Sequence, residues 1–190
     1  MIYSHKSLFT ASLLLAPSFA IAAPWAVDSA QSKLQFSGTQ GKDAFTGGFK
    51  KFTPVIEFDL AHPEQGKVDV TIDIASAYID NDKDKQEALP TDAWFAAKQF
   101  PDAKFHATAI HADKTEHHYI MSGDLTVRGV TKSVTFPFAL EPNGETMKAT
   151  GEIDLKRNDF GIGQGKEWST DQWIAYPVKV TFTLLATPAK

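Results

Sequence analysis

The stretch Tyr119-Ile120-Met121-Ser122-Gly123-Asp124-Leu125-Thr126-Val127 decides the fold class, because its side chains alternate with a period of two. The odd-numbered positions share one face and the even-numbered positions share the other, as in a half-buried β-strand. The same alternation recurs over residues 67–74, 133–140, 146–155 and 178–184, and in shorter form at 34–36 and 56–60. Strands with one dry and one wet face predict an antiparallel sheet.

Turn signals separate these runs, and one segment breaks their rhythm. Pro142-Asn143-Gly144 predicts a tight hairpin between strands at 133–141 and 146–156. Residues 82–96 predict one or two short helices, the second of which begins at the N-cap Thr91. About eight strands in one continuous run favour an all-β fold, an eight-stranded antiparallel barrel, which also removes exposed sheet edges.

Composition narrows the classes of function. The 190-residue chain is 43% hydrophobic with a net charge of −4, which excludes a disordered chain. The acidic balance also argues against nucleic acid or an anionic lipid surface as a partner. The chain contains no cysteine, so disulfides, thiol catalysis and cysteine-bound metal centres are excluded.

Residues 1–22 have the layout of a secretory signal peptide. The basic residue Lys6 precedes an apolar stretch from Leu8 to Ala16, and a membrane span would need about 20 residues. Ala20 and Ala22 place the expected cleavage after Ala22. Residues 23–190 then form one exported domain, and the absence of cysteine favours a bacterial periplasm as its location.

The inward face of the predicted barrel contains small residues at Ala107, Ala109, Gly123, Ala149 and Gly151. Either neighbouring phenylalanines fill these positions, or an apolar cavity runs through the barrel. The change Gly123→Leu separates the two alternatives, because added carbons cost about 1–3 kcal/mol in a packed core. In a cavity they enter vacant space and leave the stability of the lipid-free protein unchanged or raised. We expect the cavity.

The string from Gly123 to Thr131, followed by Val134 to Phe138, is similar to the YceI-like signature Gly-x-Leu-Thr-x-Arg-Gly-Val-Thr-x-x-Val. Further pieces match in order at residues 25–29, 48–52, 92–105 and 157–163. In one place, Glu87-Ala88-Leu89 replaces the family's Arg-Asp-x-His-Leu-like stretch. The resemblance implies a lipocalin-like barrel in the periplasm that holds a long-chain isoprenoid or related amphiphilic lipid.

Strand parity and the residues around the predicted mouth define the expected lipid contacts. They are Tyr78, Trp94, Phe95, Phe105, Ala107, Ala109, Met121, Gly123, Leu125, Phe136, Phe138, Ala149, Gly151, Ile153, Arg157, Phe160 and Trp168. Arg157 continues the inward parity of its strand, so its guanidinium needs an acceptor, either a carboxylate such as Asp159 or a ligand head group. The aromatic residues 94, 95, 160 and 168 would form a lid or plug the barrel end.

No catalytic residue, metal ligand or cofactor is expected, apart from a bound isoprenoid lipid or isoprenoid quinone as ligand. The acidic turn at residues 80–91 fails as a calcium loop at Lys85 and Thr91, and the histidines at 106, 111, 117 and 118 are expected at the surface. The expected partner is a long-chain isoprenoid or fatty amphiphile, with no nucleic acid, no stable membrane insertion and a homodimer left open.

The leading hypothesis is therefore a non-catalytic lipid carrier that serves stress response, isoprenoid or quinone metabolism, or transport. Two alternatives stay open. One is a quinone-linked redox accessory or enzyme that uses the bound isoprenoid. The other is a structural barrel with a filled core.

Overall fold

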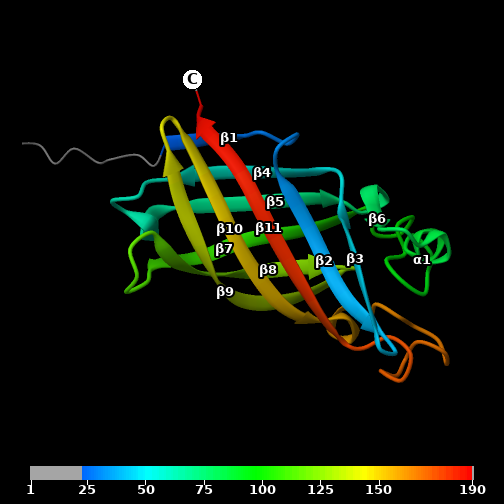
Figure 1. Ribbon diagram of the computed structural model, residues 1–190. Coiled ribbons are helices and arrows are strands. Elements are labelled where there is room, and N and C mark those ends of the chain that lie inside the picture. The colour runs from blue at the N-terminus through cyan, green and yellow to red at the C-terminus, as the bar shows by residue number, and fades with distance from the viewer. Residues whose placement is uncertain (1–22, 190) are drawn as a thin grey trace, which may run out of the picture.

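The computed structural model describes residues 23–189, so the predicted signal peptide at 1–22 lies outside the described residues. Eleven strands form one antiparallel sheet, and a short helix, α1 (Lys83–Ala88), packs beside it (Figure 1). Within residues 23–189, no helix is long and apolar enough to cross a membrane. The strands are β1 (Ala23–Val27), β2 (Lys33–Gln40), β3 (Asp43–Phe49), β4 (Phe52–Phe58), β5 (Lys67–Asp73), β6 (Ala77–Ile79), β7 (Asp102–Ala112), β8 (His118–Val127), β9 (Val130–Asn143), β10 (Thr146–Lys156) and β11 (Pro177–Pro188).

Eight of these strands close into the predicted barrel in the order β1-β4-β5-β7-β8-β9-β10-β11. The ring closes because β1 pairs with both β4 and β11. The remaining strands form a flap: β2 pairs with residues 179–183 of β11, β3 pairs with β2, and β6 pairs with β3. The predicted barrel is confirmed, and the flap accounts for the strands beyond eight.

The period of two is interrupted between β5 and β6, so the predicted inward position of Tyr78 is wrong. Ile74–Ser76 forms a 3₁₀ turn, which resets the alternation. Ala77 and Ile79 are buried, whereas Tyr78 lies on the other face of β6, with the Lys50 ammonium 5.5 Å from its ring centre.

A bulge in β7 displaces Ala109 from the inner face in the same way. The pairing of β7 with β8 shifts between Ala107 and Ala109, so that Ala109 lies opposite Ser122. Ile110, opposite Met121, takes the inward position and is 1% exposed. A bulge adds one residue to a strand and flips every later side chain to the other face.

Only one of the two predicted short helices forms. The Asp82 carboxylate accepts the Lys85 backbone N–H at 2.9 Å and caps α1. The predicted helix at Thr91 is wrong, because its hydroxyl donates backward to the Ala88 carbonyl at 2.7 Å and residues 91–100 form turns. The side chain of Gln86 accepts from Ile79 N at 2.9 Å and donates to Ala77 O at 3.0 Å, which fastens α1 to the edge strand β6.

Phenylalanine rings cover the inward glycines. A methyl group at Gly123 would lie 2.5 Å from the Phe105 ring and 2.5 Å from the His106 backbone oxygen. One at Gly151 would lie 2.5 Å from the Phe182 ring. The space above these two glycines is therefore filled, and the expectation that Gly123→Leu enters a void is wrong.

We predict that Gly123→Ala lowers the free energy of unfolding by about 1–3 kcal/mol, the usual cost of overpacking. Gly151→Ala is expected to cost less, because the Phe182 ring can swing aside whereas the backbone oxygen at His106 cannot. Urea denaturation of both variants measures the difference. Equal losses would show that the backbone contact at Gly123 does not matter.

Candidate ligand-binding cavity

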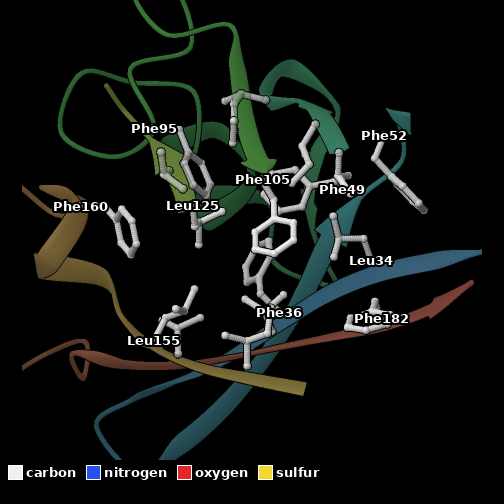
Figure 2. A pocket seen from close by; sticks show the side chains of 18 of the residues that line it. Leu34, Phe36, Phe49, Phe52, Phe95, Phe105, Leu125, Leu155, Phe160 and Phe182 are labelled. Carbon is white, nitrogen blue, oxygen red and sulfur yellow. The ribbon is translucent and has the colours of Figure 1, made fainter. Parts of the chain in front are cut away.

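A cavity of about 580 Å³ occupies the middle of the barrel. Pockets that bind small molecules measure roughly 300–1,000 Å³ and are mostly apolar. Figure 2 shows Phe105, Leu125 and Phe36 pointing from different strands into one shared space. Four inner side chains of β11 are only half-buried, because they face this space rather than a packed core: Val178, Val180, Phe182 and Leu184.

An aromatic cluster closes the end of the cavity near the β9–β10 hairpin. The Phe58 ring meets the Tyr119 ring edge-on at 5.5 Å, and the Tyr119 and Phe138 rings stack at 5.2 Å. Burial raises the pKa of Tyr119 above its ordinary value, so its hydroxyl stays neutral at physiological pH. This end of the barrel is a filled core.

The opposite end of the barrel carries the β2–β3 hairpin and α1 (Figure 1), and we call this end the mouth. Its lining includes Gln40 and Phe45 on the hairpin and Asp82, Asp84 and Lys85 at the start of α1. The Lys85 ammonium pairs with the Asp82 carboxylate. That hydrogen bond lowers the pKa of Asp82, so its carboxyl group stays ionised at neutral pH.

Arg157 supports the wall beside the mouth, and the predicted pairing with Asp159 is wrong. Its guanidinium donates to the backbone carbonyls of Ala175 at 3.2 Å, Ile162 at 2.9 Å, Thr170 at 2.9 Å and Ile174 at 2.7 Å, rather than to Asp159. The side chain is 4% exposed. Burial lowers the pKa of Arg157, but a guanidinium stays protonated in proteins.

Arg157 also joins two segments that cover the mouth. Its guanidinium lies 5.7 Å from the ring centre of Trp94, and Trp94 contacts Trp168 with ring centres 5.6 Å apart. The backbone N–H groups of Gly163 and Gln164 both donate to the Ala93 carbonyl, at 2.9 and 2.8 Å. Residues 90–97 and 161–176 therefore form a connected cover.

Arg128 holds the first of these cover segments in place. Arg128 and Gly129 both have positive φ, +52° and +73°, as a two-residue hairpin turn between β8 and β9 requires. The turn directs the Arg128 guanidinium to the backbone carbonyls of Asp92, at 2.6 Å, and Trp94. The arginine of the signature sequence thus fixes the segment that carries Trp94.

The structure brings most of the predicted contact residues to the cavity surface. These are Trp94, Phe95, Phe105, Met121, Leu125, Phe136, Phe138, Ala149, Ile153, Arg157, Phe160 and Trp168. Five of the predicted residues are not part of that surface: Tyr78, Ala107, Ala109, Gly123 and Gly151. Ala107 packs against the neighbouring core cluster.

Sequence reasoning missed much of the wall that the flap and β4 supply. Leu34, Phe36, Phe49, Phe52 and Ile56 all line the cavity. The short period-two runs at 34–36 and 56–60 carry a signal for three of them. Gln40 and the Asp82–Lys85 pair carry no local signal, because only the folded chain places them at the mouth.

The metal-site candidates considered from the sequence find little support within residues 23–189. Among residues 23–189, no three His, Asp or Glu side chains converge to hold a metal ion. His106 lies on the outer face of the barrel, with Nδ1 2.7 Å from the Asp69 carboxylate. The acidic turn at 80–91 is used to cap and begin α1.

An antiparallel barrel with a filled end, an apolar interior and a covered mouth defines a class of proteins that enclose small hydrophobic molecules. Within that class, the chain belongs to the YceI-like family, whose domain model matches residues 25–186. A UPF0312 protein of Photorhabdus laumondii is 33% identical over 170 residues, 83% of this chain and 86% of that protein.

Solved structures agree with this assignment. Burkholderia cenocepacia BcnA has a TM-score of 0.81 and 35% identity, over 85% of this chain and 100% of that chain. A polyisoprenoid binding domain from Saccharophagus degradans, implicated in plant cell wall breakdown, has a TM-score of 0.68 over 90% of this chain and 100% of that chain. At 15% identity, this second structure shows the shared fold alone.

We predict that Arg157→Met destabilises the protein by about 3 kcal/mol or more, because it leaves one buried and three partly buried backbone carbonyls without their donors, at roughly 1–3 kcal/mol for a buried group. Amide exchange at Gly163 and Gln164 should also accelerate as the cover loosens. The matched control is Lys156→Met, an exposed neighbour expected to stay within about 0.5 kcal/mol of the parent. A variant that kept its stability but lost ligand would return Arg157 to a binding role.

Proposed function

We propose that this protein is an exported carrier that holds a long-chain isoprenoid, an isoprenoid quinone or a related amphiphilic lipid in its barrel, without catalysing a reaction on it. The observation that carries the proposal is the 580 Å³ cavity with its almost entirely apolar lining. An empty hole of this kind is destabilising, at roughly 24 cal/mol per Å³ in a core, so an apolar occupant is favoured.

The family and the fold support the same ligand class. The Saccharophagus degradans structure, which shares this fold, is described as a polyisoprenoid binding domain. A flexible, branched hydrocarbon tail suits a cavity lined by aromatic and branched aliphatic side chains. At about 0.3 kcal/mol per heavy atom, a tail of roughly 30 carbons would contribute about 9 kcal/mol of binding free energy.

Export to the periplasm is part of the proposal. It rests on the signal-like residues 1–22, with a single basic residue before a short apolar stretch. In that compartment a carrier would keep the tail of a membrane lipid out of water during transfer. The absence of a catalytic role is supported by the lining, whose charged groups lie at the mouth or, in Arg157, are bound to backbone carbonyls.

The direct test is native mass spectrometry of protein purified without detergent. We expect a bound lipid, identified after extraction, whose retention is insensitive to salt because tail burial rather than charge holds it. Protein that stays lipid-free after incubation with polyprenols and isoprenoid quinones would contradict the proposal.

A substitution that fills the cavity gives a second prediction. Ala149 lines the cavity from β10, opposite Leu184 on β11. Ala149→Phe is expected to reduce lipid affinity at least tenfold while leaving the stability of the lipid-free protein unchanged or raised, since the ring enters vacant space. Thr150→Phe, one residue along on the opposite face, is the matched control and should leave affinity unchanged. Loss of affinity in both variants would contradict this placement of the ligand.

A further inference from the structure

The cavity surface is poor in polar side chains, and their positions are uneven. Among the lining residues, amide or charged side chains occur at Gln40, Asp82, Asp84, Lys85 and Arg157. Four of these lie at the mouth, on the β2–β3 hairpin or at the start of α1. The filled end of the barrel contributes none of them.

A polar head group that entered the cavity first would therefore lose its hydrogen bonds to water and find no protein groups to replace them. At the filled end, the Trp25 indole N–H is already bound to the Phe58 carbonyl at 3.0 Å. Arg157 makes four hydrogen bonds to backbone carbonyls, and Trp94 and Tyr176 lie against its guanidinium at 5.7 and 5.1 Å. Moving a polar group from water into an apolar environment where it finds no hydrogen-bond partner costs several kcal/mol. We therefore expect the tail to enter first and the head group to stay at the mouth.

The charges at the α1 side of the mouth disfavour an anionic head. Lys85 is paired with Asp82, and Lys83 is paired with Glu87 at 3.7 Å. Asp84 is exposed and forms no ion pair within residues 23–189. A phosphate or carboxylate at this position would face a net negative rim whose ammonium groups already have partners.

Gln40 provides the complementary group for an uncharged head. Its side chain is half-buried at the cavity surface and makes no hydrogen bond to another described residue. A carboxamide can both donate and accept, so it can bind a hydroxyl, a phenol or a quinone carbonyl with equal ease.

Building on the function proposed above, we propose that the cavity takes its lipid tail-first and selects an uncharged polar head group, which hydrogen-bonds to Gln40. The Asp82, Asp84 and Lys85 rim excludes phosphate and carboxylate heads. Gln40 is thus a specificity-determining residue, and Asp84 supplies the discrimination against anions.

The first experiment compares a polyprenol with the polyprenyl phosphate of equal tail length, using the full mature chain stripped of lipid. Competition against a fluorescent polyene measures both affinities at the same ionic strength. We expect the alcohol to bind at least tenfold more tightly than the phosphate. Equal or tighter binding of the phosphate overturns the head-group selection but leaves the carrier function standing, whereas failure of both lipids to bind overturns both proposals.

Two variants then test the residues. Gln40→Leu should weaken binding of the polyprenol about three- to tenfold and leave binding of the head-less polyprene hydrocarbon unchanged. Asp84→Lys should raise affinity for the polyprenyl phosphate at least threefold. The matched control is Glu145→Lys, which makes the same charge change at the β9–β10 hairpin, at the opposite end of the barrel (Figure 1).

The two variants have separate failure outcomes. A Gln40→Leu protein that loses the alcohol and the hydrocarbon equally would show that Gln40 supports the mouth rather than the head group. An equal rise in phosphate affinity for Asp84→Lys and Glu145→Lys would show that net charge, not the rim, discriminates. Either result overturns the corresponding assignment.

Discussion

The pairing of β1 with β11 is the contact on which the cavity depends. Trp25 lies opposite Pro188 and Val27 lies opposite Ala186, while the first residues of β1 pair with β4. Without β1, β4 and the end of β11 would be open edges and the apolar lining would face water. The contact joins the two ends of the described chain, so every other strand must be in place before the wall is complete. The short length of β1 also explains the flap, because it leaves residues 179–183 of β11 free to pair with β2.

The strands could be predicted from the sequence because each carries its own evidence in the alternation of side chains. That evidence is local, and it fails where a short turn or a bulge reverses the alternation of the side chains. Nothing in Ile74-Ala75-Ser76 indicates a 3₁₀ turn, and nothing in Ala107-Thr108-Ala109 indicates a bulge, yet each reverses the face on which the next residues lie. Strand parity misplaces Tyr78 and Ala109 for this reason. The inward glycines depart from expectation for another reason. Strand parity places them correctly on the inner face, but the spacing of residues does not predict which phenylalanine ring will cover each of them.

Some residues of the candidate site could likewise be predicted from the local sequence pattern, whereas others are placed there only by the tertiary fold. Aromatic and aliphatic lining residues such as Phe105, Met121 and Ile153 follow from strand parity. The role of Arg157 does not, because its acceptors are carbonyls of residues 162–175, a segment without periodicity. Carbonyl groups exist at every residue, so no sequence pattern shows which of them will surround a guanidinium. The polar rim could not be predicted either, since Gln40 and Lys85 are 45 positions apart and only the folded chain brings both to the cavity lining.

A protein that binds a ligand inside its barrel has to keep an open interior without losing its fold, and the structure meets these two demands at different places. The packed rings of Phe58, Tyr119 and Phe138 concentrate apolar burial at one end of the barrel, and rings over Gly123 and Gly151 tighten the adjoining wall. The middle can then stay open, because its neighbours supply the stability that it lacks. A molecule that binds only the folded state adds stability in proportion to the logarithm of its concentration over its dissociation constant. Cavity size is consequently a compromise between ligand affinity and the stability of the lipid-free form, and in this chain it is set by which lining positions carry a ring and which carry a small residue such as Ala149.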